Sequence, residues 1–468
     1  MKDLVNFQNQ YASITAKVLV DQQKVYFNSN ATKALSFRID QLKLLRSVLK
    51  EHENELIEAV YKDFQKGTFN AFLTELGTVY HDLNKAIKKI RGWAKPKRVG
   101  TNMLNFPGRS YIMPEPLGVS LVIGAWNYPI NLTLVPAIAA IAAGNTVVIK
   151  PSELTGHTNE VLSKIVKANF DPSFFAVVEG GVDETTQLLA QPFDKIFFTG
   201  SIPVGKLVYQ AAAKNLIPVT LELGGKSPLI VAPDANLKIC VKRLVWGKFI
   251  NAGQTCIAPD YVLVHESIEK AFLEALKKEI EACQYSLSNQ NYAQIISQKH
   301  LERLISLIEP DKVFIGGEYD RSQRVLAPTV LINVSENDKV MEDEIFGPVL
   351  PVLRYKEIDN AISFIKSRPK PLSLYLFTES SSLSEKVMNE VSFGGGMVND
   401  ALTHFVNDEL PFGGVGSSGI GSYHGEAGFK SFSHYKGIIR KPTWFEFPLK
   451  YYPYHNWKFT MIKRAMGL

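Results

Sequence analysis

The chain has 468 residues, of which 46% are hydrophobic and 21% charged, so global disorder is excluded and there is room for about three structural units. The net charge of +6 is too small over this length to indicate nucleic-acid binding. The 3 cysteines, Cys240, Cys256 and Cys283, are too few for a disulfide scaffold or an all-cysteine zinc site. We expect a reducing compartment and no metal site.

Targeting and membrane-spanning segments are not expected. Residues 1–8 lack the apolar centre of a signal peptide. The longest apolar stretch, residues 132–143, contains Pro136 and is shorter than the roughly 18 residues of a membrane span. We therefore expect a cytoplasmic protein.

Residues 1–95 have a helical pattern. Apolar side chains spaced by three, four or seven residues between Leu42 and Phe64 predict one amphipathic helix that ends near Gly67. A second helix is expected over residues 73–93. The prolines of residues 95–116 favour a linker or an extended hairpin.

From residue 118 onward, short apolar runs alternate with helical patterns, and a second such series covers residues 223–400. Strands that are buried on both faces read as continuous apolar runs, so the alternation predicts parallel sheet covered by helices. In the first series we expect helices near 131–143, 157–169, 184–190 and 203–213. The strands expected in the first series are 119–123, 146–149, 175–178, 195–198 and 219–223. Those expected in the second series are 229–231, 261–264, 350–353 and 374–377.

Cys256 lies in a run of small residues, Gly253-Gln254-Thr255-Cys256, which predicts a tight loop before a strand at Tyr261. The backbone N–H groups of such a loop can stabilise a thiolate and later an oxyanion, as a nucleophile requires. The alternative is a buried structural cysteine. That interpretation is favoured for Cys240 and Cys283, which have helical surroundings.

Two polar residues at strand ends are candidates to assist a nucleophile. Glu222 lies in an apolar strand before two glycines, and a buried carboxylate needs a partner or a chemical role. Asn127 follows the first strand of the series, where its amide can donate to an oxyanion. The alternatives are an exposed edge strand for Glu222 and an ordinary turn for Asn127.

Three further turns have the chemistry of a nucleotide site. The run Gly200-Ser201-Ile202-Pro203-Val204-Gly205 follows a strand and opens a helix, where N–H groups can face a phosphate. Lys150 and Glu153 end another strand and can meet ribose hydroxyls. Glu344 and Phe346 form an acidic and aromatic turn. Each of these, taken alone, is also compatible with an ordinary turn.

Taken together and in this order, the motifs resemble those of the aldehyde dehydrogenase superfamily from about residue 30 to residue 440. Residues 253–261 and 410–425 are most similar to the class 3 branch. The motifs that carry the resemblance are Trp126-Asn127-Tyr128-Pro129, Lys150-Pro151-Ser152-Glu153, Phe198-Thr199-Gly200-Ser201, Leu221-Glu222-Leu223-Gly224-Gly225-Lys226, Gly253-Gln254-Thr255-Cys256 and Glu344-Ile345-Phe346-Gly347-Pro348.

The resemblance implies a role for each catalytic candidate. Cys256 would add to an aldehyde, and Asn127 with the Cys256 N–H would hold the oxyanion of the thiohemiacetal. Loss of hydride to NAD or NADP would leave a thioester. Glu222, with a pKa raised by its apolar strand, would be the general base for hydrolysis to a carboxylic acid. Medium or long aliphatic and aromatic aldehydes are the implied substrates.

The resemblance also assigns cofactor contacts. Lys150 would bind the adenosine ribose, and Glu344 the nicotinamide ribose, with Phe346 packed nearby. Gly200 to Gly205 would face the pyrophosphate, with Ser201 a weaker contact than the glycines. Glu153 favours NAD, because a carboxylate opposes a 2′-phosphate, although class 3 enzymes often accept both cofactors.

The implied fold is α/β, with a Rossmann-like parallel-sheet cofactor domain, a second α/β catalytic domain and an arm that would bridge a homodimer. The cofactor domain would comprise residues 1–95 and 117–222, the catalytic domain 223–400, and the arm and tail 96–116 and 401–468. The tail is aromatic and basic from residue 443, a composition that permits contact with a membrane surface. Packing on a partner subunit or over the substrate tunnel is favoured instead.

Three other functions match parts of the pattern. An acyl-transferring enzyme of the same fold, dependent on coenzyme A or phosphate, needs no general base, so Glu222 argues against it. A cysteine hydrolase would pair Cys256 with a histidine, but the 9 histidines lie outside any local Cys–His signature. A non-catalytic binding protein would need neither Cys256 nor Glu222.

Overall fold

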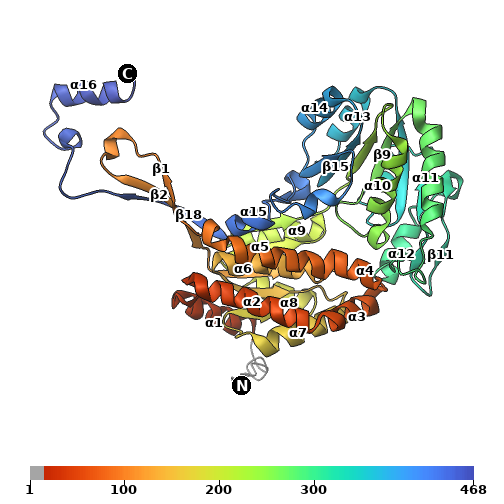
Figure 1. Cartoon of the computed structure of the whole chain (residues 1–468), viewed down its shortest axis with the longest axis horizontal. Helices are drawn as coiled ribbons and strands as arrows, with labels where there is room; N and C mark the ends of the chain where they lie inside the picture. Colours follow the sequence, from red (N-terminus) through yellow and green to blue (C-terminus); the bar gives the residue numbers. More distant parts are fainter. Residues whose placement is uncertain (1–14) are drawn as a thin grey trace.

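The computed structural model describes residues 15–468, so the stretch where no signal peptide is expected lies outside the described residues. Figure 1 shows two α/β bodies and an arm that extends away from them and carries the C-terminus. The first body is built on a six-stranded sheet, the second on a seven-stranded sheet, and the arm on a three-stranded sheet. The predicted α/β class is therefore confirmed.

The first sheet contains all of the strands expected between residues 119 and 223. Its order is β17-β7-β6-β3-β4-β5, and only β17 (Gly419–Ile420) runs antiparallel to its neighbour. This order places β7 inside the sheet. The parallel strands are β3 (Val119–Ile123), β4 (Thr146–Lys150), β5 (Phe175–Val177), β6 (Lys195–Thr199) and β7 (Val219–Glu222).

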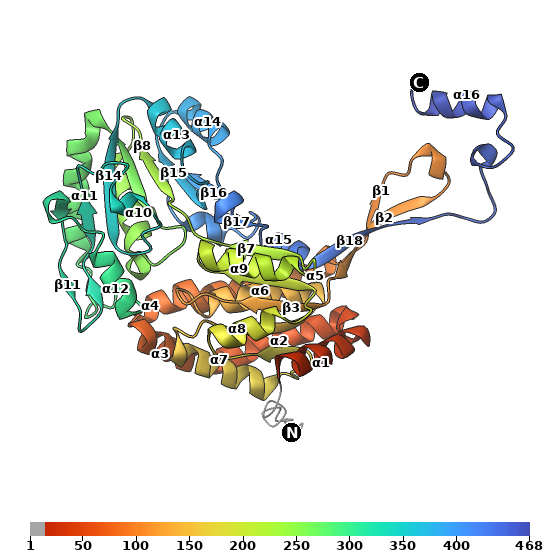
Figure 2. The same cartoon turned by 180° about the vertical axis from the view of Figure 1, so that it is seen from behind.

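Helices cover this sheet on both faces. The four expected between its strands are present as α6 (Asn131–Ala143), α7 (Gly156–Asn169), α8 (Val182–Leu189) and α9 (Ile202–Ala213). The most deeply buried is α6, because its side chains are small or aliphatic and almost all of them are in the core. In Figure 2, α9 and β7 lie on the side of the first body that faces the second body.

The N-terminal helices differ from the sequence prediction. After α1 (Ala16–Asn28), the single helix expected up to residue 64 is divided at His52 into α2 (Leu35–Glu51) and α3 (Glu53–Phe64). Apolar spacing continues across His52, which is why periodicity did not detect the break. The next helical rod begins at Thr68 rather than at residue 73. It consists of α4 (Thr68–Ala71), a π-turn η3 (Phe72–Leu76) and α5 (Gly77–Trp93).

The second sheet has the order β10-β13-β14-β9-β8-β15-β16, and only β10 is antiparallel to its neighbour. The four expected strands are present as β8 (Pro228–Val231), β9 (Tyr261–His265), β14 (Val349–Tyr355) and β15 (Ser373–Phe377). Three strands were not predicted because they are short or rich in glycine: β10 (Val313–Ile315), β13 (Thr329–Leu331) and β16 (Gly395–Val398). The helices of this body are α10 (Leu237–Phe249), α11 (Glu269–Cys283), α12 (Gln298–Ile305), α13 (Ile358–Lys366) and α14 (Ser381–Glu390).

The arm is an antiparallel sheet of β1 (Lys97–Val99), β2 (Arg109–Pro116) and β18 (Ser433–Arg440). Of the linker and the extended hairpin expected in residues 95–116, the hairpin is present, and the tail of the chain ends in α16 (Asn456–Ala465). Residues 401–432, grouped with the arm in the sequence prediction, are instead divided between the two bodies: Ala401 and Leu402 lie against Gly247 of α10, whereas β17 hydrogen-bonds to β7 in the first body. Between residues 15 and 468 no helix is both long and apolar enough to span a membrane.

Gly144 ends α6 with a left-handed backbone, and its N–H donates to the carbonyl oxygens of Ala140 and Ile141. Its φ is 99°, and a Cβ would lie 2.6 Å from the guanidinium carbon of Arg38. Arg38 cannot easily move away, because it donates to backbone carbonyls at three positions. Glycine is therefore needed at position 144 for two reasons, the left-handed backbone that ends α6 and the close approach of Arg38.

We expect Gly144→Ala to lower the free energy of unfolding by roughly 1–2 kcal/mol, because alanine is strained at positive φ and the added methyl group meets Arg38. Chemical denaturation followed by circular dichroism measures the change. Gly92→Ala is the control, since a Cβ at this position in α5 meets nothing within 4 Å. Equal stability of the two variants would contradict this account of the cap.

Candidate active site

Cys256 follows α10 in a loop of unusual backbone geometry. Three consecutive residues before it are left-handed: Asn251 with φ 54°, Ala252 with φ 52° and Gly253 with φ 73°. A Cβ on Gly253 would lie 2.3 Å from the carbonyl oxygen of Gly347, so this position accepts only glycine. The tight loop expected from the small residues is present, and the Cys256 side chain remains partly exposed.

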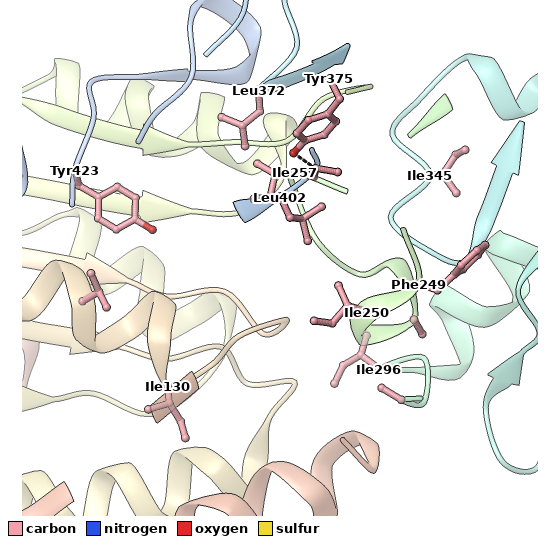
Figure 3. Packing of buried hydrophobic residues seen from close by; sticks show 14 of the residues in the cluster. Ile130, Phe249, Ile250, Ile257, Ile296, Ile345, Leu372, Tyr375, Leu402 and Tyr423 are labelled. Carbon is pink, nitrogen blue, oxygen red and sulfur yellow. Dashed lines mark hydrogen bonds between the residues drawn. The ribbon is translucent and has the colours of Figure 1, made fainter. Parts of the chain in front are cut away.

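Hydrogen bonds fix the loop on both sides of the thiol. The Gln254 amide donates to the Gln294 carbonyl at 3.0 Å and accepts from the Ile296 N–H at 3.0 Å. On the other side, the Tyr375 hydroxyl donates to the Ile257 carbonyl at 2.7 Å, the dashed line in Figure 3. Because the chain is held at these points, little freedom remains for the backbone of the cysteine.

The thiol of Cys256 is a weak acid in this structure. Burial raises its pKa to about 12, and the nearby Glu344 and Glu222 add to the rise. The N–H groups of Cys256 and Ile257 donate to the sulfur and act in the opposite direction, as the sequence suggested, but burial dominates. The thiol is therefore protonated at neutral pH in the absence of bound molecules.

Glu222 is the last residue of β7 and is buried, with 3% of its surface exposed. Because β7 has a neighbour on each side, the edge-strand alternative is wrong. Neither carboxyl oxygen has a hydrogen-bond partner among residues 15–468, and burial raises its pKa well above the usual value. Its charge contributes to the raised pKa of the Cys256 thiol, so the two groups lie close together.

Asn127 is buried and joined directly to the cysteine loop. Its side-chain Nδ2 donates to the carbonyl oxygen of Gln254 at 3.1 Å, two residues before the thiol. The backbone carbonyl oxygen of Asn127 accepts from the side chains of Asn251, at 3.0 Å, and Lys66, at 3.4 Å. The structure thus brings Asn127, Glu222 and Cys256 together from distant parts of the sequence.

Lys150 and Glu153 form a separate polar site at the end of β4. The Lys150 ammonium is buried and donates to the Pro151 carbonyl at 3.0 Å and to the Glu153 carboxylate at 3.3 Å. Glu153 is half-exposed. The Lys150 ammonium has three N–H donors and, within the described chain, these two acceptors. One donor therefore remains for a ligand hydroxyl.

The turn before α9 is tied to the catalytic strand. The Gly200 N–H donates to the backbone carbonyl of Glu222 at 3.0 Å, and Ser201 is exposed at the N-cap of the helix. The first N–H groups of a helix have no internal partner and suit an anion. Gly205 is placed differently from the expectation. It is buried, and a Cβ there would lie 2.6 Å from Leu223, so it serves packing between helix and sheet.

Glu344 and Phe346 reach the site from the loop before β14. A Cβ on Gly224 would lie 1.9 Å from the Glu344 carboxylate, so only glycine permits this approach. Burial and the nearby Asp260 raise the pKa of Glu344 to about 8, although the Gly225 N–H and two basic side chains lower it. Phe346 packs edge-on against Trp126, with ring centroids 5.3 Å apart.

Several residues that hold this arrangement were not predicted from the sequence to have a role in it. Lys66, one residue before the helix end predicted near Gly67, forms a buried ion pair with Glu75 beside Asn127. Gln254 was quoted in a motif without a role. A charged pair inside apolar helical sequence was the available signal for Glu75, since such residues need partners when buried.

The chain belongs to the aldehyde dehydrogenase family, whose model matches residues 10–438. Members of this family use NAD or NADP, and the chain is an aldehyde dehydrogenase that oxidises aldehydes. This agrees with a site that combines a thiol, a carboxyl group and an amide.

Individual relatives confirm the resemblance to class 3. The 4,4′-diaponeurosporen-aldehyde dehydrogenase of Staphylococcus aureus is 47% identical over 94% of this chain and 96% of its own. Aldehyde dehydrogenase family 3 member A2 of Pongo abelii is 45% identical over 89% and 86%. The dimeric NADP-preferring aldehyde dehydrogenase of Rattus norvegicus is 43% identical over 90% and 94%. A solved structure, the substrate-bound state of Staphylococcus aureus AldH, superposes with a TM-score of 0.95 at 45% identity and covers 97% of this chain and 100% of that one.

We expect Glu222→Gln to be more stable than the native chain at pH 8, by roughly 1–3 kcal/mol. The folded pKa of Glu222 lies above the unfolded one. The free energy of unfolding of the native chain is therefore highest below the pKa that Glu222 has in the unfolded chain. The part that depends on Glu222 is lost as the pH rises through the pKa that Glu222 has in the folded chain. Glutamine does not titrate, so the advantage of the variant should shrink at pH 5.

Denaturant unfolding at the two pH values measures this difference. Glu385→Gln is the control, because Glu385 is an exposed carboxylate in α14. A stability difference for Glu222→Gln that is the same at both pH values, or absent, would contradict the unpartnered burial of this carboxyl group.

Proposed function

We propose that this enzyme oxidises its aldehyde through a covalent intermediate on Cys256, with Glu222 as the general base for hydrolysis. The observation that carries the proposal is the buried carboxyl group of Glu222, which has no hydrogen-bond partner in the described chain and lies close to the thiol. Such a group destabilises the fold, and its raised pKa makes it a stronger proton acceptor than an exposed carboxylate.

In the first step the Cys256 thiol gives its proton to solvent water, and the sulfur adds to the carbonyl carbon of the aldehyde. The carbonyl oxygen becomes an oxyanion, which the Cys256 N–H and the Asn127 amide stabilise. An amide nitrogen carries two hydrogens. One of them is bonded to the Gln254 carbonyl, which holds the amide in place, and within residues 15–468 the second has no acceptor and can meet the oxyanion.

NAD or NADP, when bound, supplies the acceptor for the aldehyde hydride. The product that remains on Cys256 is a thioester. Glu222 then removes a proton from a water molecule, whose oxygen attacks the thioester carbon. The sulfur leaves as a thiolate, and the carboxylic acid is released.

The charges and hydrogen-bond donors of residues around the site support the proposed cofactor contacts. Lys150 has a donor for a ribose hydroxyl, and the N-terminus of α9 at Ser201 suits a pyrophosphate. Glu344 and Phe346 border the cysteine loop, where the nicotinamide ribose would lie. Glu153 beside Lys150 disfavours a 2′-phosphate, so we propose NAD as the favoured cofactor, although the rat relative is named NADP-preferring.

The proposed substrates are medium or long aliphatic and aromatic aldehydes. The segment that carries the buried Glu75 also presents apolar side chains to solvent, with Phe69 76% and Leu73 44% exposed. The name of the Staphylococcus aureus relative, a diaponeurosporen-aldehyde dehydrogenase, supports an apolar substrate.

We further propose a cytoplasmic homodimer in which the arm contacts a second copy. The arm sheet projects from the bodies in Figures 1 and 2, and its neighbour α16 leaves aromatic side chains exposed, with Trp457 at 51% and Phe459 at 62%. The rat relative is named dimeric. Contact of this tail with a membrane surface is the less favoured alternative.

Purified protein with an aldehyde panel and NAD or NADP tests the function through the absorbance of reduced cofactor. Cys256→Ser should abolish the signal. Glu222→Gln should lower steady-state turnover by roughly 100-fold or more while a single burst of reduced cofactor remains, because the thioester still forms. Cys283→Ser, at a partly exposed cysteine in α11, is the control and should retain activity.

Full activity of Cys256→Ser would refute the assignment. Turnover that requires added coenzyme A or phosphate would instead support the acyl-transferring alternative, in which hydrolysis plays no part.

A further inference from the structure

Lys66 and Glu75 form an ion pair that is buried in the first body and has no part in the mechanism above. The Lys66 ammonium lies 3.0 Å from the Glu75 carboxylate, and the two side chains are 2% and 0% exposed. A fully buried pair is seldom a net source of stability, because both charges lose their hydration. Its position therefore requires another explanation.

Glu75 is turned inward by the π-turn that interrupts its helical rod. The extra residue in this turn buries three consecutive side chains, Thr74, Glu75 and Leu76, which a regular helix would spread over different faces. One carboxylate oxygen accepts from the ammonium of Lys66. The other accepts from the backbone N–H groups of Ile130 and Asn131, each at 3.1 Å.

Those two N–H groups begin α6, three and four residues after Asn127 in the chain. A carboxylate at a helix start satisfies donors that have no internal partner and is favoured by the helix dipole. The carboxylate of Glu75 thus fixes the point at which the loop containing Asn127 becomes a helix. In Figure 3, Ile130 lies at this junction, opposite the loop that contains Ile250 and Ile257.

Lys66 holds the same loop from its other side. Its ammonium donates to the carbonyl oxygen of Asn127 at 3.4 Å and lies over the ring of Tyr128, 4.3 Å from the centroid. The Tyr128 hydroxyl is 2.6 Å from the Thr255 hydroxyl, in the residue before the nucleophile. Tyr128, the residue after Asn127, therefore contacts both the ion pair and the cysteine loop.

We propose that Lys66 and Glu75 are positioning residues that orient the Asn127 amide toward the oxyanion. The inference rests on the proposed role of Asn127 in oxyanion stabilisation. An oxyanion donor is effective only at the correct distance and angle, and a shift of about 1 Å can cost about 100-fold in rate. The ion pair fixes the donor through its main chain, at the carbonyl on one side and at the start of α6 on the other.

The test is the double variant Lys66→Met/Glu75→Gln, which removes both charges without leaving one buried alone. The burst rate of reduced cofactor should fall roughly 10- to 100-fold, while the Kd for NAD, measured by fluorescence, stays within about twofold. Glu75→Gln alone keeps an oxygen for the α6 N–H groups and should show a smaller fall in the same direction. It also keeps the inference testable if the double variant does not fold.

The matched control is Lys85→Met/Asp408→Asn, which removes another ion pair that a lysine on α5 makes with a largely buried aspartate. This variant should lose a comparable amount of stability in denaturant and retain its burst rate. If both double variants lower the burst rate equally, the Lys66–Glu75 pair is merely structural and the inference is overturned.

A cycle with Asn127→Ala separates this inference from the proposed function. If the pair acts through Asn127, its removal should lower the burst rate by less than about threefold in the Asn127→Ala background. Multiplicative effects of the two changes would overturn the inference alone. A normal burst rate in Asn127→Ala itself would overturn the proposed oxyanion role of Asn127.

Discussion

The whole site depends on the burial of one carboxyl group without a partner. Glu222 lies at the end of an interior strand, and the described chain offers neither of its carboxyl oxygens a hydrogen bond. This arrangement opposes folding, since the group must be kept protonated or lose the hydration of its charge. The result is a proton acceptor close to the partly exposed thiol of Cys256.

The second constraint is the junction between the two bodies, because the reacting groups come from both. Glu222 and Asn127 belong to the first sheet and its connections, whereas Cys256 lies between α10 and β9 of the second body. The hydrogen bond from the Asn127 amide to the Gln254 carbonyl crosses this junction. The geometry of the site is therefore set by loops that are hydrogen-bonded to each other as well as to their own sheets.

Much of this arrangement follows from sequence, and the exceptions have physical causes. The strands around Asn127 and Glu222 were predicted, because buried parallel strands form continuous apolar runs. The break at His52 and the π-turn at residues 72–76 were missed, since apolar periodicity does not report a single changed φ/ψ angle or one extra residue. Gly205 was predicted to face the pyrophosphate, but glycine is equally suited to close approach of a ligand and to close packing. The contact with Leu223, which only the structure shows, identifies packing as its role.

The division of labour between Cys256 and Glu222 is tested most directly by trapping the intermediate. Glu222→Gln is mixed with an excess of aldehyde and NAD, quenched in acid and digested, and the cysteine peptides are analysed by mass spectrometry. We predict the mass of one acyl group on the peptide that contains Cys256, and unmodified peptides for Cys240 and Cys283. An acyl group on another cysteine, or no acyl-enzyme although reduced cofactor has formed, would contradict it.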